Sequence, residues 1–198
     1  MAKVKLQNVR LSFPDLFEPG EYEGQRKFGA TFLVKPGSPE DKLIRAAMDE
    51  VAKEAFKDKG PAIVKAAMAG GNQKCCYWDG NLKTYEGYAD MMALTAKRNE
   101  DKGRPLVIDK DKTPLVAADG KPYAGCYVNA SVEIWAQDNK YGKTVRCTLL
   151  GVQFAADGDA FVHQHRGGEV PAVVEVADQP VLRDAHVGEE HLVEVRAA

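Results

Sequence analysis

A long hairpin pattern in the second half of the chain constrains the fold most strongly. Residues 126–136 and 144–154 are two β-prone runs, and the turn between them, residues 138–143, reads DNKYGK. Apolar and polar side chains alternate throughout the first run, whereas the second changes parity at Leu150-Gly151, where glycine suits a bulge or a sharp bend. Long strands that bend at bulges favour a small closed barrel over a flat sheet.

The preceding sequence supplies further strands. Residues 3–13 alternate with a change of register, which a β-bulge near Gln7-Asn8 would correct. The bulge would return the apolar side chains of this run to the core side, namely Val4, Leu6, Val9, Leu11 and Phe13. Phe13-Pro14 is expected to end the strand. The next strands along the chain are expected at residues 26–34, 91–98 and 106–108.

One segment predicts a strong helix. Ser38 is a natural N-cap, Pro39 suits the first turn, and acidic residues follow that complement the helix dipole. Gly60-Pro61 ends this helix, and a short second helix is expected over residues 61–68. Five or more antiparallel strands with one long and one short helix predict a mainly β fold, an OB-like Greek-key barrel.

The charge is uneven along the chain. The whole sequence has a net charge of −2, but residues 167–198 hold seven acidic against two basic side chains, or −5. Residues 1–166 therefore carry +3. We interpret residues 1–166 as the barrel domain and residues 167–198 as an acidic C-terminal tail or extension. A basic body with an acidic tail is typical of nucleic-acid binders, although a fluctuation of surface charge gives the same pattern.

The sequence predicts a cytoplasmic protein. No apolar stretch approaches the roughly 20 residues of a membrane span, and residues 1–5 lead directly into a strand pattern. The cysteines include an adjacent pair, Cys75-Cys76, which fits neither a disulfide framework nor a C-x-x-C metal pair. Together with Cys126 and Cys147 they are expected to be buried free thiols in a reducing compartment.

Aromatic and basic side chains occupy the polar positions of the predicted strands. They also occur in an irregular stretch at residues 75–90, which is expected to be an exposed loop. This mixture suits a single-stranded nucleic acid, because bases stack on rings and Lys or Arg neutralises phosphates. The candidate stacking residues are Tyr77, Trp78, Tyr85, Tyr88, Tyr127 and Trp135. The candidate phosphate-binding residues are Lys3, Lys5, Arg10, Arg26, Lys27, Lys97, Arg98, Lys140, Lys143 and Arg146. Each alone has a plainer interpretation, as a packed ring or a solvated surface charge.

Enzyme signatures are absent from the sequence. Glycine-rich phosphate loops, nucleophile elbows and H-E-x-x-H are not found. His163 and His165, with Asp157 or Asp159, could offer metal ligands, but the spacing is common and further ligands are lacking nearby. We therefore expect no catalysis, no cofactor and no metal.

Two stretches resemble a known family. Residues 4–19, VKLQNVRLSFPDLFEP, and the KFGATFLV strand after them resemble the N-terminal signature of a bacteriophage protein family, formerly a domain of unknown function. Residues 123–154 carry the similar pattern G-C-Y-V-N-A followed by L-L-G-V-Q. The resemblance covers roughly residues 3–157. Characterised members of the family are single-stranded-DNA-binding proteins with an OB fold, similar to the replication ssDNA-binding proteins of podophages.

The resemblance implies a sequence-nonspecific ssDNA-binding protein that coats and protects replication or recombination intermediates in the host cytoplasm. It also implies replication or recombination partners, reached through the acidic C-terminal segment, and it allows self-association. This tail departs from the family pattern, since valines dilute it and it ends Arg-Ala-Ala. Two alternatives stay open: a virion structural or assembly protein without nucleic-acid binding, and a strand-annealing recombination protein.

Overall fold

The structure is a computed structural model that describes residues 1–22 and 24–162. Strands dominate this part of the chain. The strands are β1 (Ala2–Tyr22), β2 (Gln25–Val34), β3 (Tyr77–Asp79), β4 (Met92–Asn99), β5 (Leu106–Ile108), β6 (Tyr127–Asn139) and β7 (Gly142–Ala156). Between β2 and β3 the chain forms the helices α1 (Pro39–Phe56) and α2 (Gly60–Ala69). Short 3-10 segments are η1 (Lys57–Lys59), η2 (Gly71–Gln73), η3 (Gly80–Leu82), η4 (Glu100–Lys102) and η5 (Ala117–Asp119).

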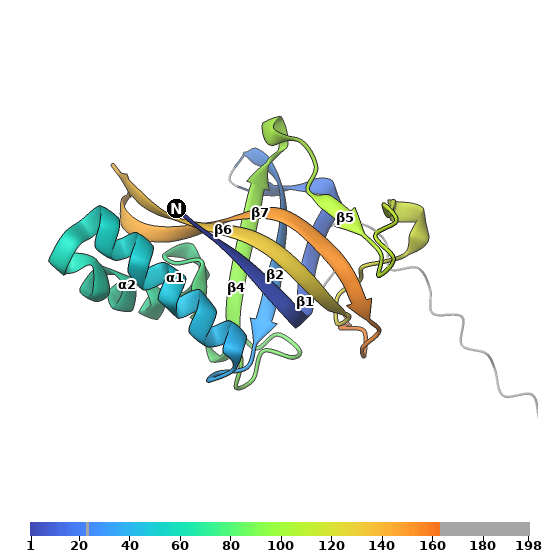
Figure 1. Cartoon of the computed structure of the whole chain (residues 1–198), viewed down its shortest axis with the longest axis horizontal. Helices are drawn as coiled ribbons and strands as arrows, with labels where there is room; N and C mark the ends of the chain where they lie inside the picture. The colour runs from blue at the N-terminus through green and yellow to red at the C-terminus, as the bar shows by residue number, and fades with distance from the viewer. Residues whose placement is uncertain (23, 163–198) are drawn as a thin grey trace, which may run out of the picture. The chain divides into compact units, whose positions relative to one another are not determined.

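Five of these strands close into a barrel. The sheet order is β3-β4-β2-β1-β6-β7-β5, and its neighbouring strands are antiparallel except for β5 and β7. A parallel contact between Lys97 on β4 and Thr148 on β7 joins the wall, so that β1, β2, β4, β7 and β6 surround one core (Figure 1). The predicted mainly β, OB-like barrel is therefore confirmed.

Bulges bend the long strands where the sequence indicated. β1 shifts its register against β6 between Leu6 and Val9, and Asn8 there has a positive φ of 50°. In the hairpin of β6 and β7 the register shifts at Leu150, next to Gly151. Both bulges keep the apolar side chains of a curved strand on its inner side, which a regular alternation would not do.

The end of β1 differs from the prediction. The strand does not stop at Phe13-Pro14 but continues to Tyr22, with a further register shift against β2 between Ser12 and Asp15. Phe13 has a φ of 47°, and its ring joins a second apolar cluster outside the barrel wall. A bulge at this point accommodates Pro14, which has no N–H for the ladder, and turns Phe13 away from the core side.

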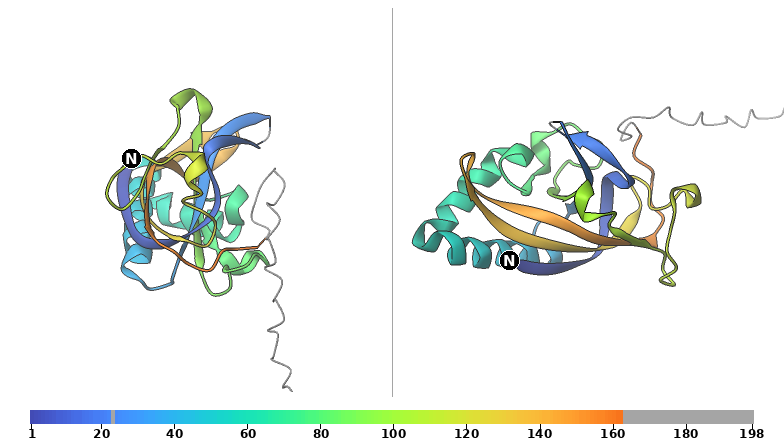
Figure 2. Two further views of the ribbon diagram at one scale, coloured as in Figure 1. Left: turned by 90° about the vertical axis from the view of Figure 1, so that its right-hand side faces the viewer. Right: turned by 90° about the horizontal axis from the view of Figure 1, so that it is seen from above.

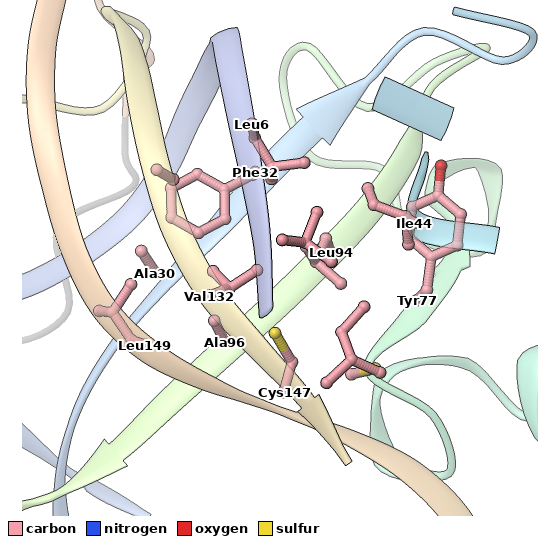
Figure 3. Close-up of a cluster of buried hydrophobic side chains, with 14 of the residues drawn as sticks. Leu6, Ala30, Phe32, Ile44, Tyr77, Leu94, Ala96, Val132, Cys147 and Leu149 are labelled. Atoms are coloured by element: carbon pink, nitrogen blue, oxygen red, sulfur yellow. The ribbon is translucent and has the colours of Figure 1, made fainter. Parts of the chain in front are cut away.

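Helix α1 covers the main core at one end of the barrel. Ser38 caps the helix as predicted, since its Oγ accepts a hydrogen bond from the Asp41 N–H at 3.2 Å. Ile44 packs among side chains from the strands, which converge from opposite walls (Figure 3). Those labelled are Leu6, Ala30, Phe32, Tyr77, Leu94, Ala96, Val132, Cys147 and Leu149. The two helices lie together at one end of the barrel (Figure 2), and β5 lies towards the other end (Figure 1).

All four cysteines are buried, as predicted. Burial raises the pKa of Cys126 to about 11, and it also raises the pKa of Cys147. These two thiols are therefore protonated at neutral pH and pack as small apolar side chains.

Candidate nucleic-acid interface

The outer surface of β2 and β4, here termed the β2–β4 face, is a floor of short side chains. Gly29 and Thr31 on β2 pair with Lys97 and Thr95 on β4, and the two threonine hydroxyls are 3.2 Å apart. Because no long side chain rises from three of these four positions, the floor lies at the bottom of a shallow depression. The depression is lined by Phe13, Gly29, Ala30, Thr31, Asn72, Trp78, Tyr85, Tyr88, Thr95, Ala96 and Lys97.

Four rings, here termed the aromatic cluster, stand beside this floor: Phe13, Trp78, Tyr85 and Tyr88. The ring centroid of Tyr85 is 5.0 Å from that of Phe13 and 5.3 Å from that of Tyr88, both edge to face. Tyr88 is buried, and its hydroxyl forms a hydrogen bond with that of Ser12 at 2.9 Å. Tyr85 is 40% exposed. The cluster therefore presents the ring of Tyr85 to solvent, with packed rings supporting it from behind.

Three predicted stacking residues do not present a ring to solvent. Tyr77 and Trp78 were expected in an exposed loop, but they lie on β3 and are 0% and 2% exposed, and Tyr88 is 1% exposed. Because β3 pairs with β4, its successive side chains point to opposite sides of the barrel wall. Tyr77 enters the main core, and Trp78 packs under Tyr88. The prediction of exposed rings is wrong for these three residues.

Tyr77 belongs to a buried polar cluster under α1. Its hydroxyl donates to Asp41 Oδ1 at 2.7 Å, and the same carboxylate accepts from Arg45 Nε at 2.7 Å and from the Gly37 N–H at 2.8 Å. Burial opposes ionisation of Asp41, but the hydrogen bonds from Tyr77, Gly37 and Arg45 outweigh it and hold the pKa of Asp41 below its usual value. Burial and the same carboxylate raise the pKa of Tyr77. This cluster joins α1 to the barrel and is structural.

The basic candidates nearest the β2–β4 face are Arg26, Lys27, Lys97 and Arg98. Lys97 lines the depression, and Lys27 lies further along β2 at a position of the same parity as Gly29. Arg26 lies 3.6 Å from a glutamate of η4. Arg98 donates two hydrogen bonds, at 2.6 and 2.8 Å, to backbone oxygens at the end of η4. Lys27 and Lys97 are thus the basic residues placed on the face itself.

The outer surface of β6, here termed the β6 face, holds other candidates. Among the described strands β6 pairs with β1 and β7 only, so its outer side is turned away from β2 and β4 (Figure 1). Trp135 is half-buried, and its Nε1 donates to Thr148 Oγ1 at 3.1 Å. Arg146, the cross-strand neighbour of Trp135, donates to two glutamines. Lys3 and Lys5 are exposed on the neighbouring part of β1.

Arg10 and Tyr127, a cross-strand pair of β1 and β6, contact a later part of the chain. Arg10 Nε donates to Gly125 O at 3.1 Å, and an Nη donates to Asp159 O at 2.9 Å. Its guanidinium lies 4.4 Å from the ring centroid of Phe161 and 5.9 Å from that of Tyr127. The Arg10 side chain, expected to bind phosphate, thus contacts the protein itself.

The turn between β6 and β7 brings together Lys140 and an aromatic residue that the sequence analysis missed. Tyr141 is 79% exposed, and the Nζ of Lys140 lies 5.0 Å from its ring centroid. Lys143 forms an ion pair with Asp138 across the same turn. An aromatic residue beside a lysine in a hairpin turn was a usable signal, since a turn has no core to bury it.

Residues 1–22 and 24–162 contain neither a cluster of metal ligands nor a helix suited to a membrane. No three or more His, Cys, Asp or Glu side chains of this part lie together as a metal site. His163 and His165 lie outside the described residues, as does the acidic segment 167–198. The helices of the described part lack the long apolar stretch that a membrane-spanning helix requires.

The sequence matches proteins of phages. Residues 2–180 match a family described as the ssDNA-binding protein of Enterobacter phage Enc34. A protein named p50, from Acyrthosiphon pisum secondary endosymbiont phage 1, is 44% identical over 180 residues, which cover 89% of this chain and 93% of that protein.

Solved structures share the fold. The single-stranded DNA-binding protein from bacteriophage Enc34, in complex with ssDNA, matches with a TM-score of 0.65 and 25% identity, over 81% of this chain and 89% of that chain. The ssDNA-binding protein gp2.5 of bacteriophage T7 is alike in fold alone, with a TM-score of 0.51 and 10% identity over 85% and 99% of the chains. Since the family match spans most of the sequence, the chain belongs to the Enc34 ssDNA-binding protein family.

Proposed function

We propose that this protein binds single-stranded DNA without sequence preference and coats and protects it during phage replication and recombination. A relative in the same family has been solved with ssDNA bound, and the family description names the same ligand. The observation that carries the proposal for this chain is the β2–β4 face, where an exposed ring, a floor of short side chains and a lysine adjoin.

The bound strand lies over the floor formed by Gly29, Thr31 and Thr95. A base reaches the ring of Tyr85 there without displacing a long side chain, and such stacking contributes about 1–3 kcal/mol per base. Lys97 and the neighbouring Lys27 neutralise phosphates and release counterions, so affinity falls as salt rises. OB folds bind oligonucleotides on their second and third strands, which in this barrel are β2 and β4.

The turn of β6 and β7 provides a second contact further along the strand. It occupies the place of the loop between the fourth and fifth barrel strands, which OB folds also use for ligands. Tyr141 stacks on a base and Lys140 contacts the adjoining phosphate. The side chains of the β6 face, including Trp135, Lys3 and Lys5, take no part in binding the same strand.

Binding in this form needs neither catalysis nor a cofactor, and we propose none. The protein acts where phage DNA is replicated, in the host cytoplasm. Replication or recombination proteins are proposed partners through residues 167–198, whose seven acidic side chains also compete with DNA for basic residues. Deleting these residues is therefore expected to tighten ssDNA binding, and unchanged or weaker binding contradicts this.

The direct test is fluorescence anisotropy with a labelled oligo-dT of about 30 nucleotides, longer than the site of one OB fold. The titration is repeated over a salt series, with duplex DNA and RNA of matched length as competitors. Tight binding that prefers ssDNA and weakens with salt supports the proposal. An absence of binding at low salt, together with stable oligomers, would favour a virion structural protein instead.

A further inference from the structure

Residues 157–162, here termed the strap, follow β7 and pack on the outside of the barrel wall. The Tyr123 hydroxyl donates to Asp157 Oδ1 at 3.0 Å, and the Phe161 N–H donates to Ala124 O at 3.0 Å. Gly125 lets the strap approach the segment before β6 closely, because a Cβ at this position would lie 2.1 Å from the backbone oxygen of Asp159 in the strap. The strap is therefore fitted to the segment before β6 by its backbone.

Phe161 and Arg10 anchor the strap from its two sides. Phe161 is buried in the second apolar cluster, together with Trp78 and Tyr88. The Arg10 guanidinium lies 4.4 Å from the Phe161 ring centroid and also donates to Asp159 O at 2.9 Å. A single side chain of β1 thus holds both the ring and the backbone of the strap, by a cation–π contact and a hydrogen bond.

The strap in turn contacts the loop of residues 80–91, which carries Tyr85. The Phe161 ring lies directly against Gly87, where a Cβ would be 2.4 Å from the ring. The Val162 N–H donates to Glu86 Oε2 at 2.8 Å. The strap thus holds Glu86 and Gly87, which follow Tyr85 directly in the chain, and Phe161 also shares its apolar cluster with Tyr88.

We propose that Arg10 is a positioning residue for ssDNA binding: it fixes the strap, the strap fixes the loop of residues 80–91, and the loop presents Tyr85 in a preset orientation. The inference rests on the proposed function of the β2–β4 face. It gives Arg10 a role other than the phosphate contact that its charge suggests. Without the strap, the loop loses conformational entropy when DNA orders it. This cost weakens the affinity for ssDNA by about 2- to 10-fold.

The test compares Arg10→Ala, Phe161→Leu and Lys97→Ala in the full chain, by anisotropy of labelled oligo-dT over a salt series. Arg10→Ala and Phe161→Leu are expected to weaken binding by a similar factor at every salt concentration, with the slope of log K against log[salt] unchanged. Lys97→Ala is the matched control for a phosphate contact and lowers the slope by about 0.7. Because Phe161 carries no charge, an effect that it shares with Arg10 does not come from a phosphate.

Hydrogen exchange of residues 80–91 is the second readout, and it is expected to quicken in both strap variants. A reduced salt slope for Arg10→Ala with unchanged exchange would make Arg10 a phosphate ligand and overturn the inference. Faster exchange with full affinity overturns it as well, because the loop would then be held without consequence for DNA. If the unmodified protein binds no ssDNA, the proposed function fails first and the positioning role fails with it.

Discussion

The β2–β4 face and the β6 face carry similar kinds of side chain but arrange them differently. On the β6 face the aromatic and basic side chains project from the strands and bond to their neighbours, as Trp135 does to Thr148. On the β2–β4 face the strands contribute glycine and threonine, and the exposed ring of Tyr85 comes from a loop beside them. In the proposed mode of binding, a base lies on an open floor beside a ring, an arrangement that outward strand parity alone does not reveal.

Replacing one aromatic residue on each face, Tyr85 or Trp135, tests this comparison with the largest expected effect. Tyr85→Ala is expected to cost about 1–3 kcal/mol, or about 5- to 150-fold in ssDNA affinity, because a stacked base loses its partner. Tyr85→Phe keeps the ring and nearly all the affinity, and Trp135→Leu on the β6 face leaves affinity unchanged. Anisotropy titrations measure all three. Equal losses at Tyr85 and Trp135 would break the comparison.

The lysines of the two faces give a second, smaller contrast. The double variant Lys27→Ala/Lys97→Ala is expected to lower the salt slope by about 1.4, since each lost phosphate contact on a single strand removes about 0.7. The double variant Lys3→Ala/Lys5→Ala removes the same charge from β1 and serves as the control. A salt series on both variants measures the slopes. If both lower the slope alike, the net charge of the protein governs binding and neither face is special.

The hairpin turn is expected to contribute less and only to long ligands. Tyr141→Ala should cost at most about 1 kcal/mol with an oligo-dT of about 30 nucleotides, because a ring at an exposed tip has no packed support. An oligonucleotide of about 6 nucleotides covers the β2–β4 face alone and should bind the variant as well as it binds the unmodified protein. A loss of equal size with both lengths would place Tyr141 inside the main site.

Tyr77, eight residues before Tyr85, is expected to have no effect on DNA affinity but a clear effect on stability. Tyr77→Phe removes a hydrogen bond from the buried Asp41 carboxylate and should lower the free energy of unfolding by about 1–3 kcal/mol at pH 7. Because the pKa of Asp41 is lowered by folding, its ionised form stabilises the protein at neutral pH, and this contribution is lost as pH falls below about 4.

Urea unfolding of both proteins, over a series of pH values from 7 down to the lowest at which both stay folded, measures this effect. The difference between Tyr77→Phe and the unmodified protein should shrink as pH falls, because protonation of Asp41 removes the charge that the hydrogen bond stabilises. A difference of the same size over the whole series would mean that the hydrogen bond to the ionised carboxylate is not its source.

The barrel was predictable because its signals are local and repeated. Alternation, the two bulges and the Ser38 cap are all read from neighbouring residues, and each is present in the structure. The orientation of Phe13 was not predictable in this way. A second bulge in β1, at Pro14, turns the Phe13 side chain away from the core, and the alternation of apolar residues gives no sign of it.

The candidate site was predictable only in part, because residues distant in the sequence determine which candidate side chains are buried and what they contact. β3 is three residues long, too short for a period to show, and its pairing with β4 buries Tyr77 and Trp78. Arg10 contacts Asp159, which lies 149 positions away along the chain. Such a contact leaves no local pattern, so Arg10 is indistinguishable in the sequence from a lysine or arginine that faces solvent.

The closure of the barrel has a consequence for its synthesis. β1 and β4 are made early, but their partners β6 and β7 come last, and the contact of Lys97 with Thr148 needs the first half of β7. Until then both early strands have unpaired edges that invite aggregation, and the many long-range pairings favour slow folding. At about 5–20 residues per second, the 49 residues from 100 to 148 take about 2–10 s to translate. During those seconds the part of β4 that later contacts β7 has no partner strand on that edge.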